Sequence, residues 1–77
     1  MPHIVVKMYA GKPEADKAKL ADELAKTLMQ VLGSPEKAVS VAIEEFAPAD
    51  WPEAVYKPDI LETSATLYKK PGYNPFA

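Results

Sequence analysis

The sequence has no cysteine, no arginine and only one histidine among its 77 residues. Without cysteine the chain can form no disulfide and suits the reducing cytoplasm, which is the location we expect. Transition-metal sites usually need three or four protein ligands, which one histidine without cysteine does not supply. We therefore expect no metal site, and we expect His3 to be a surface residue of a strand rather than a ligand.

Strong net charge and long hydrophobic runs are also missing. The formal net charge is −2, so we expect no surface for nucleic acid. The longest apolar runs are only a few residues long, so we expect neither a signal peptide nor a membrane-spanning helix. What remains is an ordinary globular composition, 48% hydrophobic and 26% charged, in a chain long enough for one domain over residues 1–77.

Two strands and one helix are predicted in the first 46 residues. Residues 3–9 and 38–46 carry β-branched apolar side chains at alternating positions, as half-buried strands do. Between them, residues 14–32 repeat leucine and valine at helical spacing, with acidic residues in the first turn and Gly33 after the last. A strand, a helix and a strand in this order form a β-α-β unit with parallel strands.

The remaining residues are divided by prolines and predict short C-terminal helices and a tail. Residues 50–53 are typical of a short helical turn, and a second helix is expected over residues 59–69, behind Pro58. The closing KKPGYNPFA is expected to be an ordered tail, because Tyr73 and Phe76 favour burial.

The fold class predicted from these elements is α/β, more narrowly α+β, and it is incomplete in one chain. Two strands do not make a self-sufficient sheet, and their exposed edges need covering or pairing. A chain of this length also buries only about 60% of its unfolded surface. We therefore expect a homodimer whose four-stranded sheet has helices on one face, although a hexamer would complete the sheet equally well.

Pro2 has both a structural and a chemical interpretation. Proline is tolerated at the first position of a strand because only a hydrogen-bond donor is missing there. Behind a residue as small as proline, however, the initiator methionine is normally removed. Pro2 would then be a free secondary amine, held in a fixed place by the strand.

The succession of PHIVVKMYAGK, a crossover helix, VSVAIEEF and Trp51 resembles the 4-oxalocrotonate tautomerase family over most of the chain. The tail LYKKPGY and the chain length resemble a bacterial subgroup of dimeric tautomerase-like proteins. The resemblance implies an isomerase without metal or organic cofactor, in which Pro2 is the catalytic base. Pro2 would move a proton between enol and keto forms, a task that needs a pKa near the working pH. Lys7 or Lys12 could supply a cation that lowers the pKa of its amine.

The resemblance also implies three substrate-binding residues, two of which depart from the family. Lys12 and Ser40 stand where the family has arginines, and Trp51 falls at its aromatic position, which walls an apolar pocket. Lysine meets a carboxylate as a point charge, and serine offers one neutral hydrogen bond. A small enolisable 2-keto acid resembling phenylpyruvate is therefore expected instead of the family's dicarboxylate. Each residue also has a structural interpretation: a solvated turn lysine, a small packing serine and a core tryptophan.

Two other functions stay open. A protonated Pro2 could act as an acid in hydration, dehalogenation or decarboxylation, which a pKa well above neutral would favour. The chain could also be a non-enzymatic dimer that binds small molecules or partners. If Met1 stays attached, Pro2 has no basic lone pair, and the mechanism that uses it as a base is excluded.

Overall fold

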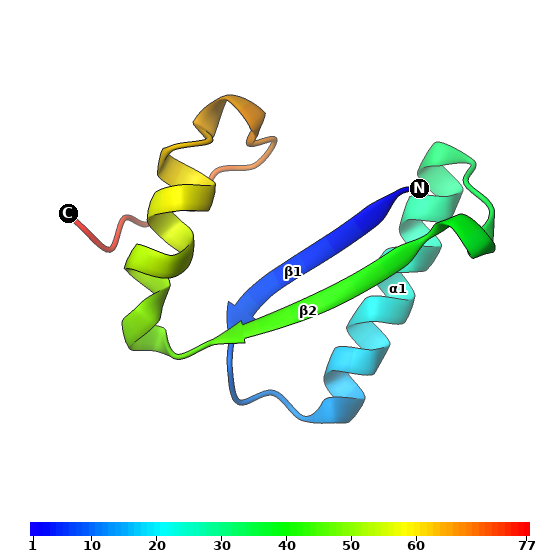
Figure 1. The fold of residues 1–77 in the computed structure, drawn as a ribbon, viewed down its shortest axis with the longest axis horizontal. Helices are drawn as coiled ribbons and strands as arrows, with labels where there is room; N and C mark the ends of the chain where they lie inside the picture. Colours follow the sequence, from blue (N-terminus) through cyan, green and yellow to red (C-terminus); the bar gives the residue numbers. More distant parts are fainter. The chain divides into compact units, whose positions relative to one another are not determined.

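The computed structural model describes all residues from Met1 to Ala77 and divides them into two compact units, Met1–Glu45 and Phe46–Ala77. The first unit holds strand β1 (His3–Tyr9), helix α1 (Glu14–Leu32), the 3-10 turn η1 (Glu36–Ala38) and nearly all of strand β2 (Ser40–Phe46). The two strands are neighbours in one sheet and run parallel (Figure 1). The predicted β-α-β unit is confirmed, while the single domain over residues 1–77 stays a prediction.

Helix α1 has the bounds that the sequence predicts. It begins behind Pro13, whose φ of −60° suits a helix start, and Glu14 and Asp16 lie in its first turn, where acidic side chains oppose the positive end of the helix dipole. It ends at Gly33, which adopts a left-handed conformation with φ 68° and donates its N–H to the carbonyl of Met29 at 2.9 Å. Only glycine enters this conformation without a steric cost, so the position of Gly33 in the sequence determines where the helix ends.

Strand β2 begins at Ser40, two residues later than predicted. Residues Glu36–Ala38 form a 3-10 turn behind Pro35 instead. The N–H of Ala38 bonds to the carbonyl of Pro35 at 3.0 Å, and the N–H of Val39 bonds to that of Glu36 at 3.1 Å. The turn uses these backbone groups locally, so they cannot join the sheet.

The second unit has the short C-terminal helices that the sequence predicts, but their bounds differ. Its main helix is η3 (Pro52–Leu61), preceded by the turn η2 (Pro48–Asp50) and followed by the turn η4 (Ser64–Thr66), so the helix predicted over residues 59–69 is wrong. Its wide turns have i→i+5 hydrogen bonds and accommodate Pro58, which has no N–H to donate. The helix ends where Thr63 bonds to the carbonyl of Asp59, since threonine hydroxyls compete for helical carbonyls.

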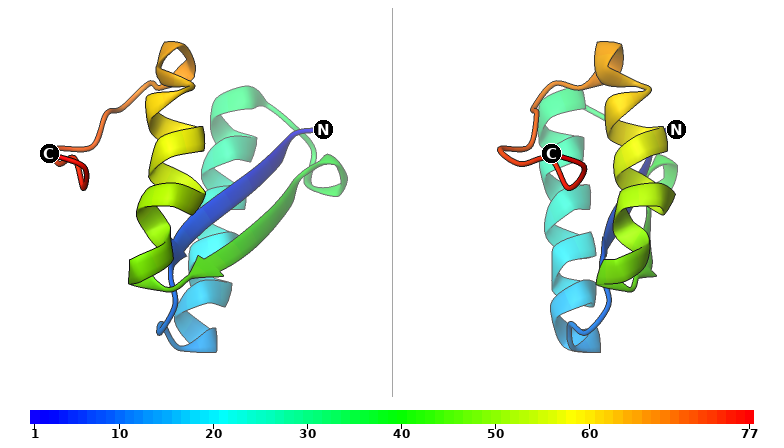
Figure 2. Two further views of the ribbon diagram at one scale, coloured as in Figure 1. Left: turned by 60° about the vertical axis from the view of Figure 1, so that its left-hand side comes forward. Right: turned by 90° about the vertical axis from the view of Figure 1, so that its left-hand side faces the viewer.

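Helix α1 covers one face of the sheet in the first unit (Figures 1 and 2). Val41, Ile43 and Glu45 of β2 line one hollow together with Ala18 and Ala21 of α1. Because side chains alternate along a strand, Ser40, Ala42 and Glu44 point to the opposite face. The sheet therefore has a helix-covered face and a second face that no element of the first unit covers.

The first unit buries none of its side chains fully. Leu20 of α1 is 37% exposed, and Val31 and Leu32 at the end of the helix are 75% and 64% exposed. Only Val55 and Tyr56, both in the second unit, are buried. A single copy thus leaves much of its apolar surface in water.

No helix of the chain is both long and apolar enough to cross a membrane.

An ion-pair cluster joins α1 to β2. The Nζ atom of Lys17 lies 2.8 Å from Oε1 of Glu45 and 3.2 Å from Oε2 of Glu14. The hydrogen bond from Lys17 lowers the pKa of Glu45, and a backbone hydrogen bond from Gly11 lowers it further. The hydrogen bond to Glu45, followed by that to Glu14, raises the pKa of Lys17. Glu45 therefore ties the helix and the preceding loop to the strand.

Replacing Glu45 with glutamine should lower the melting temperature at pH 7, because the amide keeps the shape of the side chain and loses its charge. The folded-state pKa of Glu45 lies below its ordinary 4.5, so its stabilising contribution is present above pH 4.5 and is lost as the pH falls further. The difference in melting temperature between the wild type and Glu45→Gln should therefore shrink between pH 5 and about pH 3.

Thermal melts of both proteins across this pH range test the expectation. Glu44→Gln is the matched control, since Glu44 is the exposed neighbour on the opposite face and should change little. A difference that stays constant down to about pH 3 would show that the charge of Glu45 is not its source.

Candidate active site

The starts of the two strands lie side by side and bring Pro2 and Ser40 together. The backbone N–H of Ser40 donates to the carbonyl of Pro2 at 3.2 Å. Pro2 directly precedes β1 and Ser40 opens β2. Two of the predicted site residues therefore meet in one chain, as the parallel β-α-β unit requires.

The free α-amine of the described chain belongs to Met1. It donates to the carbonyl of Ala38 at 2.7 Å, just before β2 begins. The nitrogen of Pro2 is then part of the peptide bond to Met1 and has no basic lone pair. Removal of Met1 would transfer the α-amine to Pro2, whose carbonyl is held independently by Ser40.

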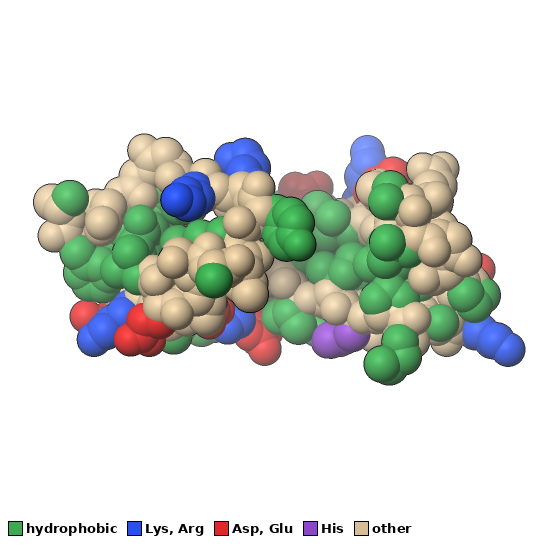
Figure 3. Space-filling model, turned by 90° about the horizontal axis from the view of Figure 1, so that it is seen from above, with side chains coloured by type: hydrophobic (Ala, Val, Ile, Leu, Met, Phe, Trp, Pro, Cys, Tyr) green, Lys and Arg blue, Asp and Glu red, His purple; other side chains and the backbone are tan.

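His3 is a partner of Ser40 that sequence reasoning missed. Its Nδ1 atom lies 2.6 Å from Oγ of Ser40, in an exposed position. The sequence prediction that His3 is a surface residue is confirmed, and the space-filling view shows this one histidine in purple at the surface (Figure 3). The pairing could have been found only from the register of the strands, which sets His3 beside Ser40.

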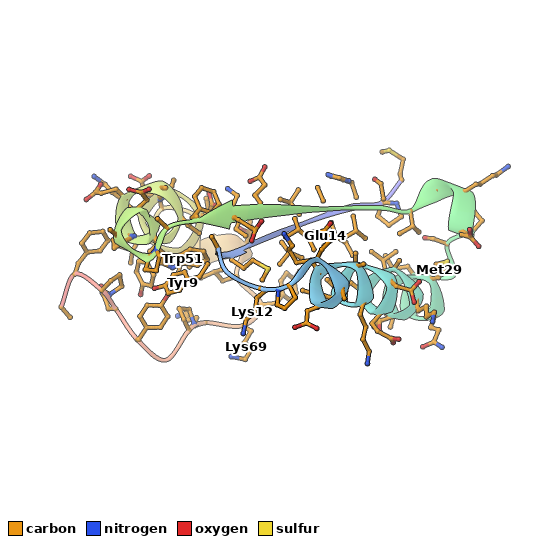
Figure 4. All side chains as sticks on the ribbon, turned by 90° about the horizontal axis from the view of Figure 1, so that it is seen from below. Tyr9, Lys12, Glu14, Met29, Trp51 and Lys69 are labelled. Carbon is orange, nitrogen blue, oxygen red and sulfur yellow. The ribbon has the colours of Figure 1, made fainter.

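Lys12 lies far from Pro2 in the same chain. It stands in the loop behind β1, whose seven residues span about 23 Å. There it lines a hollow of about 230 Å³ with Met8, Asp16 and Leu20. Figure 4 places Lys12 near Glu14 at the first turn of α1, away from Met29 in the last. Lys7, in the middle of β1, is also about 16 Å along the strand from Pro2.

Trp51 belongs to the second unit, where other aromatic residues fix its ring. Its Nε1 donates to Oη of Tyr73 at 2.9 Å, and its ring meets Phe46 edge to face at 6.2 Å. Tyr56 holds the same tail segment, since its hydroxyl donates to the carbonyl of Tyr73 at 2.9 Å. The tail is therefore ordered against η3, although Tyr73 remains 50% exposed. Trp51 itself is half-buried, and this degree of burial agrees both with a pocket wall and with a core residue.

The chemically useful groups at the start of the sheet are one imidazole, one hydroxyl and the chain terminus. The imidazole and the hydroxyl can each donate or accept a hydrogen bond. No group of three or more histidine, cysteine, aspartate or glutamate side chains is placed to hold a metal ion. This end of the sheet therefore has groups for proton transfer and for binding a polar ligand.

A family model described as "Tautomerase enzyme" matches residues 2–54 of this chain. The match begins at Pro2 and spans β1, α1, β2 and Trp51. It thus includes all four residues singled out from the sequence.

Curated relatives match the chain over nearly all of its length. A probable tautomerase from Xylella fastidiosa is 48% identical over 100% of this chain and 94% of its own length. Tautomerase PptA from Cronobacter sakazakii is 40% identical over 95% of this chain and 97% of its own. Among solved structures, TomN, described as a 4-oxalocrotonate tautomerase homologue in the tomaymycin biosynthetic pathway, is 34% identical with a TM-score of 0.63. That likeness covers 65% of this chain and 77% of TomN.

Proposed function

The chain belongs to the tautomerase family and is an enzyme of that class, and on this basis we propose that it interconverts the keto and enol forms of small 2-keto acids with Pro2 as general base. The position of Pro2 carries the proposal. It is the first residue of the family match and stands at the head of β1, where Ser40 holds its carbonyl.

The proposed reaction begins with the removal of Met1, which turns Pro2 into a secondary amine. This amine accepts a proton from the carbon beside the substrate carbonyl and returns it at the position that yields the other tautomer. An ordinary α-amine has a pKa near 8, and that of a proline amine is higher, so the site must lower it toward the working pH. Apolar surroundings and a nearby cation both disfavour the ammonium form and supply this shift.

Lys12 enters this site from a second copy of the chain. In one copy Lys12 lies beyond the far end of β1 and cannot reach a substrate bound at Pro2. A second copy that pairs with the sheet can bring its own Lys12 to that place, where the ammonium group meets the substrate carboxylate. We therefore propose a homodimer, which would also cover apolar side chains that a single copy leaves exposed.

The family resemblance assigns Trp51 to the apolar wall of the substrate pocket, and we propose that role for it. Tyr73 and Phe46 fix the indole ring, so its face can pack against a flat substrate without a further loss of side-chain freedom. Together with one lysine charge and one serine hydroxyl, this wall favours a monoanion with an apolar side chain. The proposed substrates are accordingly phenylpyruvate-like 2-keto or enol acids, and the proposed location is the cytoplasm.

Equilibrium sedimentation should find a dimer and no stable folded monomer at micromolar concentrations, because the first unit alone buries no side chain fully. A monodisperse, folded monomer of the wild type would contradict both the completed sheet and the shared site.

Blocking the amine of Pro2 should nearly abolish turnover. A variant with one extra residue before Pro2 keeps an amide nitrogen there, and kcat/KM should fall by about 10²–10⁴, the usual contribution of a general base. Pro2→Ala keeps a primary amine and should retain part of the activity. Intact mass establishes the terminus of each protein, and circular dichroism establishes the fold. Equal activity of the extended and the processed proteins would rule out the amine mechanism.

The preference for a monocarboxylic over a dicarboxylic substrate should depend on Ser40. The wild type should turn over a monocarboxylic enol such as enol-phenylpyruvate faster than a matched dicarboxylic enol. Ser40→Arg should move the ratio of the two kcat/KM values toward the dicarboxylate by about 10-fold to 100-fold, since it adds one charge-assisted contact.

The matched controls separate charge from shape. Ser40→Ala removes the hydroxyl and adds no charge, and Ser64→Arg adds the same charge at an exposed position in η4. Neither control should favour the dicarboxylate. A wild type that is clearly faster on the dicarboxylate would contradict the proposed substrate class.

A further inference from the structure

The hydrogen bond between His3 and Ser40 lies beside Pro2 and has no role in the reaction described so far. Nδ1 of His3 and Oγ of Ser40 are 2.6 Å apart. Each residue is the first of its strand, and Ser40 points to the sheet face opposite α1. Both are exposed, so a ligand can reach the pair.

A serine hydroxyl has one proton, and this limits what Ser40 can do for a ligand. If Ser40 donates its proton to Nδ1, it has none left for a substrate oxygen and can only accept. If Nδ1–H donates to Oγ instead, the hydroxyl proton is free and can point outward. The proton position on His3 therefore decides whether Ser40 accepts from a substrate or donates to it.

We propose that His3 is a positioning residue that donates its Nδ1–H to Ser40, so that the hydroxyl of Ser40 donates to a carboxylate oxygen of the substrate. This inference rests on the proposed function, since it deepens the account of the same site. An anionic oxygen repels the lone pairs of Ser40 and attracts its proton, so bound substrate and the Nδ1–H arrangement stabilise each other. A hydroxyl that accepts one hydrogen bond also donates a stronger one.

The pair thereby replaces a fixed charge with an oriented neutral donor. Ser40 stands where the family resemblance leads one to expect arginine. Its hydroxyl has a single proton, which binds a carboxylate only when the O–H points toward the carboxylate oxygen. His3 is the neighbouring side chain bonded to Ser40, and the backbone bond between Ser40 and Pro2 keeps that proton close to the proposed base.

Nitrogen-15 NMR of the processed protein tests the arrangement without any need for activity. The chain has one histidine, so the imidazole signals of the spectrum come from the two ring nitrogens of His3 alone. At pH 8.5 we expect the proton on Nδ1, and Ser40→Ala should move it to Nε2. A wild-type ring with its proton on Nε2 alone would overturn the proposal.

Kinetics with a monocarboxylic enol test the role in substrate binding. An asparagine amide can place an N–H where Nδ1 lies, whereas glutamine places its amide near Nε2. His3→Asn should keep KM within about threefold of the wild type. His3→Gln, His3→Ala and Ser40→Ala should each raise KM about fivefold to tenfold with little change in kcat, as expected for one lost hydrogen bond to bound substrate.

The double variant separates the proposal from a purely structural role. If His3 acts through Ser40, then His3→Ala adds no further increase in KM to that of Ser40→Ala. Independent, multiplying effects, or rescue by glutamine rather than asparagine, would overturn the proposal. A wild type with no tautomerase turnover would instead refute the proposed function, and the NMR spectrum would still decide the arrangement of the pair.

Discussion

The backbone hydrogen bond from Ser40 to Pro2 sets the register on which the rest of the first unit depends. With the two strand starts level, His3 lies beside Ser40, and alternation along β2 sends Glu45 to the face that α1 covers. A shift of one residue would turn Val41 and Ile43 away from α1 and bring Ser40 and Glu44 against it. The same register thus places the proposed chemistry on one face and the packing and ion pairs on the other.

The fold of the first unit fixes the residues of the proposed site at the strand starts, but it does not form a buried core in a single copy. A single β-α-β unit can hold the strand starts together, but it buries no side chain of its own and leaves Lys12 beyond the far end of β1. In the proposed homodimer, the completed sheet would contribute both to stability and to the site. On that proposal the oligomeric state and the catalytic geometry would be two aspects of one structural requirement, and a change that separates the copies would disturb both.

Prediction from the sequence succeeded where the deciding signals are local. Pro13 and Gly33 flank α1 and gave both of its ends, and the parallel unit followed from the order of the elements. It failed at Pro58, which was taken as a helix boundary and lies inside η3, and at the start of β2, where the 3-10 turn η1 takes up residue 38. The contacts of Trp51 with Tyr73 and of His3 with Ser40 join residues 22 and 37 positions apart, and periodicity carries no information on such pairs. Pro2 and Ser40 could be placed together because parallel strands start at the same edge, whereas the distance of Lys12 from Pro2 follows only when the length of β1 is considered.

The terminal amine of Met1 bonds to Ala38 without displacing Pro2 from its own contact with Ser40. The first unit can therefore accommodate the methionine without any change in the register of its strands. On the proposed mechanism a chain that keeps Met1 would be folded but inactive, as a zymogen is. Its activation would require the removal of Met1, whose amine would first have to leave its hydrogen bond to Ala38.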